Sequence, residues 1–148
     1  MQQLKIKRVR SNQDLPLPQY ESLWSSGLDL RADVNETIIL KPGHRSLIPT
    51  GIAVEMEKSF EIQVRPRSGL AIKKGLSLVN TPGTIDADYR GEIAVIVINL
   101  GLEDITITRG ERIAQMVVCP VVHPEIIEVS DLSVTQRGAG GFGSTGSG

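Results

Sequence analysis

The chain has 148 residues, 40% of them hydrophobic, and a formal net charge of −1. This length suits one domain with its own core, and the near-neutral charge argues against a surface built to neutralise a nucleic-acid backbone. A single cysteine excludes an intramolecular disulfide, and no apolar stretch reaches membrane-spanning length. We therefore expect a cytoplasmic protein with neither nucleic acid nor membrane as a partner.

Charged and aliphatic residues alternate in the first basic run, residues 5–10 (KIKRVR). Alternation predicts a first strand with a solvated charged face, and a targeting or nucleic-acid patch is the less favoured alternative. Further along, residues 25–33 (SSGLDLRAD) place Asp29 between two leucines. An acid flanked in this way is expected to be exposed, although it is also able to support a metal ion through water.

Short segments rich in β-branched residues follow, separated by turns that contain glycine or proline. They predict an all-β fold, either a closed barrel or a jelly roll, with one short helix near residues 67–75. Residues 93–98 (IAVIVI) are apolar throughout, which fits a strand buried on both faces, whereas residues 104–108 alternate. The segments are 36–56, 60–71, 92–101, 104–118 and 125–130.

Cysteine and histidine chemistry is not expected. Cys119 lies in an apolar run, residues 113–122, with no histidine nearby in sequence, so core packing is favoured over a reactive thiol. His44 and His123 are far apart in sequence, which argues against a zinc site.

Several polar residues sit where a ligand would be held. Arg65 and Arg67 share strand parity at a strand end where a helix begins, so one is a candidate for structure and the other for an anion site, although a solvated basic turn fits equally well. Arg112 and Gln115 are the polar members of an otherwise apolar strand. They need hydrogen-bond partners from the protein or from a ligand.

Residues 80–92 (NTPGTIDADYRGE) carry the clearest candidate for acid–base chemistry. Asp86 and Asp88 are two apart, so in an extended segment their carboxylates point to the same side. A carboxylate near a metal-neutralised phosphate is able to take a proton from water as a general base. The alternative is that Asp88 caps the turn and Asp86 is a surface charge. Tyr89 in this turn is not needed by an aliphatic core.

The C-terminal residues 137–148 hold six of the fifteen glycines and should be disordered on their own. Ser144 stands where a Walker loop has its lysine, so we do not expect such a loop. Glycine amides, hydroxyl groups, the Arg137 guanidinium and the Phe142 ring together predict a strap for a nucleotide. A solvated flexible terminus is the alternative, but it leaves the arginine and the ring unexplained.

The chain resembles the homotrimeric deoxyuridine 5′-triphosphate nucleotidohydrolase (dUTPase) family over residues 26–146. Five motifs occur in the family's order: GLDLRA, RPRSGLA, NTPGTIDADYRGE, GERIAQMV and RGAGGFGSTG. The resemblance implies a jelly-roll-like β barrel of the β-clip type over residues 1–136. It also implies a flexible arm, residues 137–148, that closes over an active site, and a trimer whose active sites are shared between subunits.

The activity that the resemblance implies is hydrolysis of dUTP to dUMP and pyrophosphate with Mg²⁺ on the triphosphate. This keeps uracil out of DNA and supplies dUMP for thymidylate synthesis. By motif match, Asp86 activates the water that attacks the α-phosphorus, and Tyr89 packs against the deoxyribose where a 2′-hydroxyl would clash. The uracil edge would be bound by Asn80 and by the hairpin backbone at Gly83, Thr84 and Ile85.

The resemblance also implies how the phosphates are held. Asp29 matches an acid that assists the hydrated metal, and Phe142 would lie over the uracil. Arg112 fits either a ligand contact or a structural role between subunits. The residues matched to phosphate contacts are Arg67, Ser68, Gly69 and Gln115, with Arg137, Gly143, Ser144 and Thr145 in the tail.

Two other functions are compatible with these residues. One is a deoxycytidine triphosphate deaminase on a related fold, against which the short chain, the tyrosine hairpin and the tail motif argue. The other is a non-catalytic regulator that binds nucleotide on the same scaffold. Release of ammonia from dCTP would indicate the first, and dUTP binding without pyrophosphate release the second.

Overall fold

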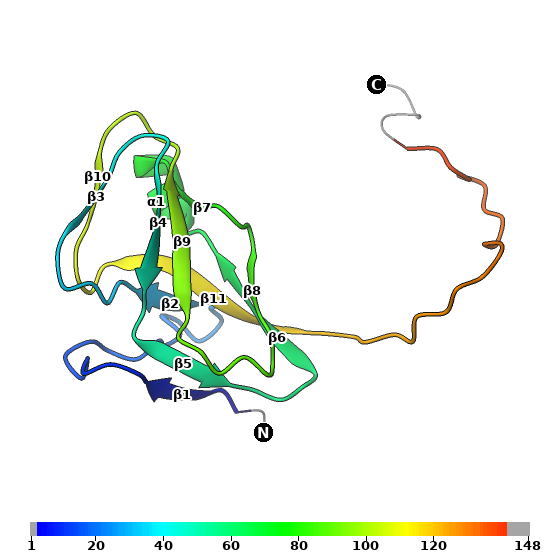
Figure 1. Ribbon diagram of the computed structural model, residues 1–148, viewed down its shortest axis with the longest axis horizontal. Helices are drawn as coiled ribbons and strands as arrows, with labels where there is room; N and C mark the ends of the chain where they lie inside the picture. The colour runs from blue at the N-terminus through cyan, green and yellow to red at the C-terminus, as the bar shows by residue number, and fades with distance from the viewer. Residues whose placement is uncertain (1–2, 142–148) are drawn as a thin grey trace.

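The all-β prediction is confirmed in the computed structural model, which describes residues 3–141. These residues form eleven strands and one short helix (Figure 1). No helix among them is long and apolar enough to cross a membrane. The elements are β1 Lys5–Arg8, β2 Leu28–Arg31, β3 Ile38–Leu40, β4 Arg45–Pro49, β5 Ile52–Glu55, β6 Phe60–Arg65, α1 Ser68–Lys74, β7 Leu76–Leu78, β8 Gly83–Ile85, β9 Ala94–Asn99, β10 Ile105–Ile107 and β11 Arg112–Pro120.

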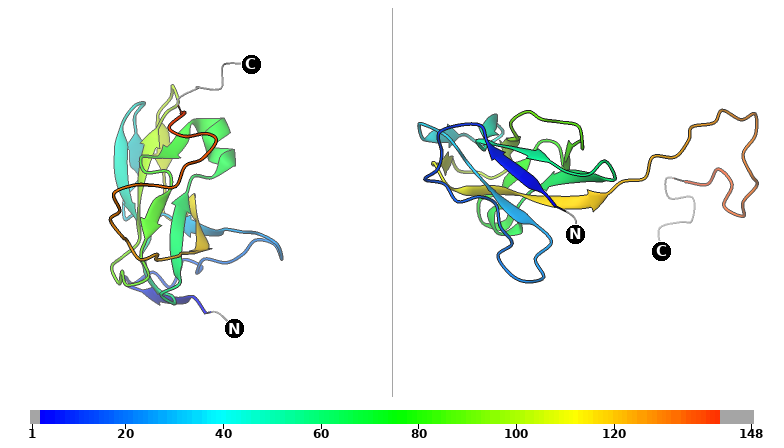
Figure 2. Two further views of the ribbon diagram at one scale, coloured as in Figure 1. Left: turned by 90° about the vertical axis from the view of Figure 1, so that its right-hand side faces the viewer. Right: turned by 90° about the horizontal axis from the view of Figure 1, so that it is seen from below.

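All the paired strands are antiparallel, and they form four sheets within the described residues. The largest sheet has the order β2-β11-β6-β8, and a three-stranded sheet has the order β4-β9-β7. Two-stranded ribbons, β1-β5 and β10-β3, complete the set. Figure 2 shows the sheets from two further sides. Closure of these sheets into one jelly-roll-like barrel stays a prediction.

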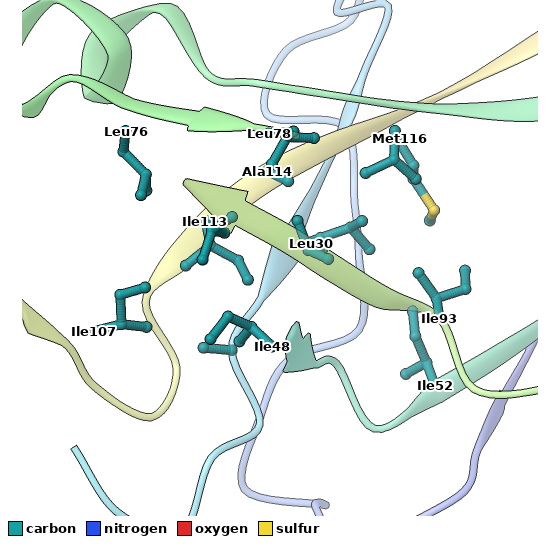
Figure 3. Packing of buried hydrophobic residues seen from close by; sticks show 14 of the residues in the cluster. Leu30, Ile48, Ile52, Leu76, Leu78, Ile93, Ile107, Ile113, Ala114 and Met116 are labelled. Atoms are coloured by element: carbon teal, nitrogen blue, oxygen red, sulfur yellow. The ribbon is translucent and has the colours of Figure 1, made fainter. Parts of the chain in front are cut away.

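One aliphatic core joins the sheets (Figure 3). Leu30 of β2, Ile48 of β4 and Met116 of β11 are among its fully buried side chains, although these strands belong to two different sheets. The core contains no buried aromatic ring among the described residues, and Phe60 only packs against its edge. Branched aliphatic side chains therefore supply most of the hydrophobic stabilisation, and each methylene taken out of water is worth about 0.8 kcal/mol.

Local predictions for the start of the chain, the helix and the alternating strand are confirmed. β1 exposes Lys5 and Lys7, and β10 alternates between buried and exposed residues. The short helix is α1, which ends at Gly75 in the left-handed conformation, φ 70°. Glycine carries no steric penalty at that position, so the chain turns directly into β7.

The apolar run 93–98 is not buried on both faces, so that expectation is wrong. β9 alternates between half-buried and buried residues, because only Val95, Val97 and Asn99 point into the core. The opposite face of the strand contributes Ala94 and Ile96 to the wall of a hollow described below. Because the wall of a surface hollow is commonly apolar, these side chains are apolar without being fully buried.

Two expectations for the C-terminal half are also wrong. Residues 125–130 form no strand; the chain from residue 121 to 141 runs away from the sheets, and Ile126 is 89% exposed (Figures 1 and 2). No strand among residues 3–141 pairs with it. Cys119 is half-buried rather than in the core, because it lies at the end of β11, where its sulfur is 3.8 Å from the Arg65 guanidinium. The boundary at residue 136 stays a prediction.

A buried polar cluster joins the loops at one end of the fold. Asp33 is 2% exposed, accepts a hydrogen bond of 2.9 Å from the Asn12 amide and forms an ion pair with Arg109. The same arginine contacts Asp14 at 3.0 Å, and this hydrogen bond holds the pKa of Asp14 below its ordinary value. Gly51 completes the cluster, since its carbonyl accepts from Asn12 at 3.2 Å and its amide donates to Glu92 at 2.8 Å.

Gly51 has a φ of 70°, and a Cβ built on it would overlap the Asn12 amide and the Asp33 carboxylate. We predict that Gly51→Ala lowers the free energy of unfolding by more than about 3 kcal/mol, because backbone strain adds to the loss of buried hydrogen bonds. The measurement is urea unfolding at a fixed protein concentration. Gly43→Ala is the control: Gly43 has a φ of 76° with nothing within 4 Å, so strain alone should cost about 1 kcal/mol. Equal losses would contradict the role of the cluster.

Candidate functional site

The first hollow lies at the start of α1 and has a volume of about 540 Å³. It brings together five of the predicted site residues, from three elements distant in sequence: Asp29, Arg67, Ser68, Gly69 and Gln115. The loop before β2 completes one wall. The residues predicted to serve the phosphates and the metal therefore lie together, except for those of the tail.

Asp29 is the electrostatic centre of this hollow. Its carboxylate is 2.8 Å from Nε of Arg67 and 3.1 Å from Nη1 of Arg112. Its side chain is only 13% exposed, so the expectation of an exposed acid is wrong; the two guanidinium groups compensate the buried charge. Arg112 also lies 3.7 Å from Glu21. Arg67 is therefore held in one orientation, with its charge directed at the hollow.

Gln115 is positioned from β11 by both of its neighbouring strands. It lies opposite Asp29 in β2 and opposite Arg65 in β6, and its Nε2 donates to the Pro66 carbonyl at 2.9 Å. Arg65 itself bonds to Gln63 at 2.6 Å. Of the two arginines that share strand parity, Arg65 is thus the structural one and Arg67 lines the hollow.

The start of α1 supplies further donors. Ser68 and Gly69 are its first two residues, and their backbone N–H groups have no acceptor inside the helix. No side-chain cap bond is formed at Arg67, the N-cap residue. Backbone and hydroxyl donors of this kind suit an anionic group, with the Arg67 guanidinium beside them.

The second hollow, also of about 540 Å³, lies between the hairpin of residues 80–92 and β9. Leu47, Val64 and Leu78 give it an apolar lining. It brings together the other predicted group, Asn80, Gly83, Thr84, Ile85, Asp86 and Tyr89. An apolar lining with a few polar groups is typical of a site for a flat organic ring.

Asp86 and Tyr89 are held by the turn that separates them. The Tyr89 amide donates to the Asp86 carbonyl at 3.1 Å, and the Tyr89 hydroxyl donates to the Glu92 carbonyl at 3.0 Å. The Asp86 side chain is exposed and, among residues 3–141, no ion pair or side-chain hydrogen bond involves it. Its carboxylate is therefore available to accept a proton, unlike that of Asp29. Asp88 does not line this hollow.

The two hollows share no lining residue. In one chain, the predicted phosphate residues and the predicted base and sugar residues thus form separate surfaces. Arg137 is exposed, and its Nε donates to the Gly140 carbonyl at 2.8 Å, in the segment that runs away from both (Figure 1). The four other predicted tail residues lie outside the described residues: Phe142, Gly143, Ser144 and Thr145.

Sequence reasoning missed some lining residues of the first hollow, chiefly Glu21, Gly27 and Lys73. Lys73 had a usable signal, since it follows Gly69 by four residues and therefore lies on the same face of the helix. Glu21 gave no such signal. Its position depends on the path of the loop before β2, which no local pattern specifies.

A family model described as dUTPase matches residues 13–146. The chain belongs to the dUTPase family. It is 58% identical over 143 residues to the deoxyuridine 5′-triphosphate nucleotidohydrolase of Thermoanaerobacter sp. (strain X514), covering 97% of each chain. The corresponding Caulobacter vibrioides protein is 53% identical over 145 residues, covering 97% of this chain and 94% of that one. This dUTPase chain is thus matched over nearly its full length.

Solved structures confirm the dUTPase fold. The dUTPase of Staphylococcus bacteriophage 80alpha with dUPNHPP superposes with a TM-score of 0.87 at 27% identity, covering 98% of this chain and 99% of that one. The family model, which matches residues 13–146, includes all five sequence motifs, because they lie between residues 26 and 146. The family prediction is therefore confirmed.

The residues of the first hollow fit a metal ion carried by a substrate better than one bound by the protein alone. No group of three or more His, Cys, Asp or Glu side chains in the described part of the chain is placed to hold a metal ion. One Asp29 oxygen accepts a hydrogen bond from Arg112 and the other forms an ion pair with Arg67, and each keeps a lone pair that is able to accept from water. Mg²⁺ commonly keeps several waters and binds through substrate phosphates, which suits this arrangement.

Proposed function

We propose that this enzyme, a dUTP diphosphatase by family, hydrolyses dUTP to dUMP and pyrophosphate. The observation that supports this most is the second hollow, in which a turn places a free carboxylate, a tyrosine ring and an amide side chain around an apolar lining. Asn80 and the backbone of β8 would bind the uracil edge, where cytosine would present mismatched donors and acceptors. Tyr89 would pack against the deoxyribose.

Asp86 is the general base of this proposal. Its carboxylate lines the second hollow and, in the described chain, carries no ion pair that would compete for its lone pairs. It would take a proton from the water that attacks the α-phosphorus, so that hydroxide character develops only at the reacting position. The bond from the α-phosphorus to the bridging oxygen then breaks, and pyrophosphate leaves.

The first hollow would hold the phosphates through Arg67, Ser68, Gly69 and Gln115. Its charged lining residues are two acids, Glu21 and Asp29, and two cations, Arg67 and Lys73, so it carries little net charge of its own. A triphosphate would need further positive charge. Bound Mg²⁺ would neutralise phosphate oxygens so that water approaches the phosphorus, and Asp29 would accept a hydrogen bond from its hydration shell.

We further propose that the active site is shared in a homotrimer. One nucleotide needs both hollows, and because these are separate in a single chain, different copies would supply them. The segment of residues 121–136 exposes Val122, Ile126 and Val134 to water, which suits burial against another copy. The tail, residues 137–148, would then close over the nucleotide, with Phe142 on the uracil and Arg137, Gly143, Ser144 and Thr145 at the γ-phosphate.

In the cell, such an activity would keep uracil out of DNA and supply dUMP for thymidylate synthesis. We place it in the cytoplasm because a single cysteine gives no disulfide framework for an oxidising compartment.

The test of the function is pyrophosphate release from dUTP, dTTP, UTP and dCTP, each with and without Mg²⁺. We expect release from dUTP with Mg²⁺ and a kcat/KM for the other nucleotides lower by a factor on the order of 10²–10⁵, since cytosine leaves buried polar partners unpaired and the methyl group of dTTP and the 2′-hydroxyl of UTP need space. Ammonia release from dCTP would instead identify a deaminase. Binding of dUTP without pyrophosphate would identify a regulator.

Asp86→Asn should lower kcat for dUTP by a factor on the order of 10²–10⁴, the usual contribution of a general base, because the amide cannot take the proton. The Kd for a non-hydrolysable dUTP analogue should stay within about threefold, since shape and hydrogen-bonding capacity are nearly kept. Steady-state kinetics and calorimetry measure the two quantities. Asp88→Asn, a neighbour outside the second hollow, is the control and should keep kcat. Normal turnover in Asp86→Asn would rule out this base.

Truncation after Gln136 should leave the oligomer intact and lower kcat/KM for dUTP at least about 100-fold, because the tail excludes water only once it closes. Light scattering of the full-length and shortened chains measures the mass, and the expected value is three chains in both. A monomeric full-length protein would refute the shared site. Full activity of the shortened chain would refute the role of the tail.

A further inference from the structure

Gly91 lies against the hydroxyl end of the Tyr89 ring. A Cβ built on Gly91 would lie 2.5 Å from Cζ and 3.0 Å from Cε2 of the tyrosine, and closer still to its hydroxyl oxygen. The backbone of Gly91 is outside the left-handed region, so its conformation is open to any residue. The need for glycine here is therefore spatial and comes from the ring alone.

Few other contacts fix this ring. Tyr89 is 44% exposed, so the core does not enclose it. Its hydroxyl donates to the Glu92 carbonyl at 3.0 Å, and the Glu92 carboxylate is itself held by Arg10 at 2.9 Å and by the Gly51 amide at 2.8 Å. Residue 92 holds the hydroxyl by this hydrogen bond, and the bare backbone at residue 91 leaves room for the same end of the ring. Tyr89 also lines the second hollow.

We propose that Gly91 is a specificity-determining positioning residue: its missing side chain seats the Tyr89 ring at the depth that admits a deoxyribose and rejects a ribose. This inference rests on the proposed hydrolysis of dUTP. Discrimination against one added hydroxyl requires a surface placed to within a fraction of an ångström, since looser packing leaves room for the extra oxygen. An exposed ring gains that precision only from the surface on which it lies.

Alanine at this position should move the ring and leave the fold in place. The backbone accepts alanine without strain, and the atom in the way is the far end of a rotatable side chain. The tyrosine must shift by about 1 Å to restore ordinary van der Waals distances. A ring moved out of its seat leaves room for the 2′-hydroxyl, so the preference for dUTP over UTP falls.

The experiment measures kcat and KM for dUTP and UTP in Gly91→Ala. We expect the ratio of kcat/KM for dUTP to that for UTP to fall at least about tenfold, with unfolding in urea nearly unchanged. Gly43→Ala is the matched control, since it is strained and remote from the hollow: it should lose stability and keep the ratio. An unchanged ratio in Gly91→Ala, in a protein that hydrolyses dUTP, overturns the proposal.

A double-mutant cycle with Tyr89→Ala separates positioning from a general structural effect. If Gly91 acts through the ring, Gly91→Ala should change the ratio by less than about twofold once the ring is absent. A full effect in that background overturns the proposal.

The NMR signals of the tyrosine rings report the position of the Tyr89 ring without an activity assay. They are simple to assign because the chain has only Tyr20 and Tyr89. Gly91→Ala should shift the Tyr89 signal, and an unshifted signal contradicts the seat. If the unaltered protein fails to hydrolyse dUTP, the proposed function fails whatever the ring does.

Discussion

The double pairing of β11 is the constraint on which the first hollow depends. This nine-residue strand pairs with β2 on one side and β6 on the other, so Asp29, Gln115 and Arg65 lie in one row across the sheet. Side chains alternate between the two faces of a strand, so a slip of one residue would bury Gln115 and send Met116 toward solvent. Burial of Met116 and Ala114 opposes that slip and thereby fixes the polar row.

An irregularity in the same strand explains why Arg112 and Gln115 lie on one face of the sheet. Three positions apart in a regular strand, they would face opposite sides of the sheet. The pairing with β2 shifts between Arg112 and Ala114, and both Ile113 and Ala114 are buried, as one inserted residue requires. The bulge therefore brings Arg112 to the face on which Asp29 accepts its hydrogen bond. One carboxylate then orders two guanidinium groups whose mutual repulsion would otherwise spread them apart.

Sequence predicted those parts of the site that are local in the chain. Asn80, Asp86 and Tyr89 share a hollow because one hairpin carries them, and Arg67 to Gly69 stay together because a strand end becomes a helix start. The sequence could not predict the burial of Asp29, because this burial depends on arginines 38 and 83 positions away. Nor could it predict the bulge in β11, which has no sequence pattern of its own. The alternation of β9 was hidden for a similar reason: its second face is apolar because it borders a hollow, which hydropathy cannot distinguish from a core.

Glycine has two opposite roles in this molecule. In residues 137–148 it raises the entropy of the free chain, which is the cost of any ordered tail. In the hollows it provides space: a Cβ on Gly27 would lie 2.5 Å from the Gln115 carboxamide oxygen, and one on Gly83 would lie 3.0 Å from the Asn80 amide nitrogen. Neither residue has a left-handed φ, so each gives up about 0.5–1 kcal/mol relative to alanine for room rather than for a turn. Polar side chains of the two hollows thus lie close to bare backbone, in space that a Cβ would fill.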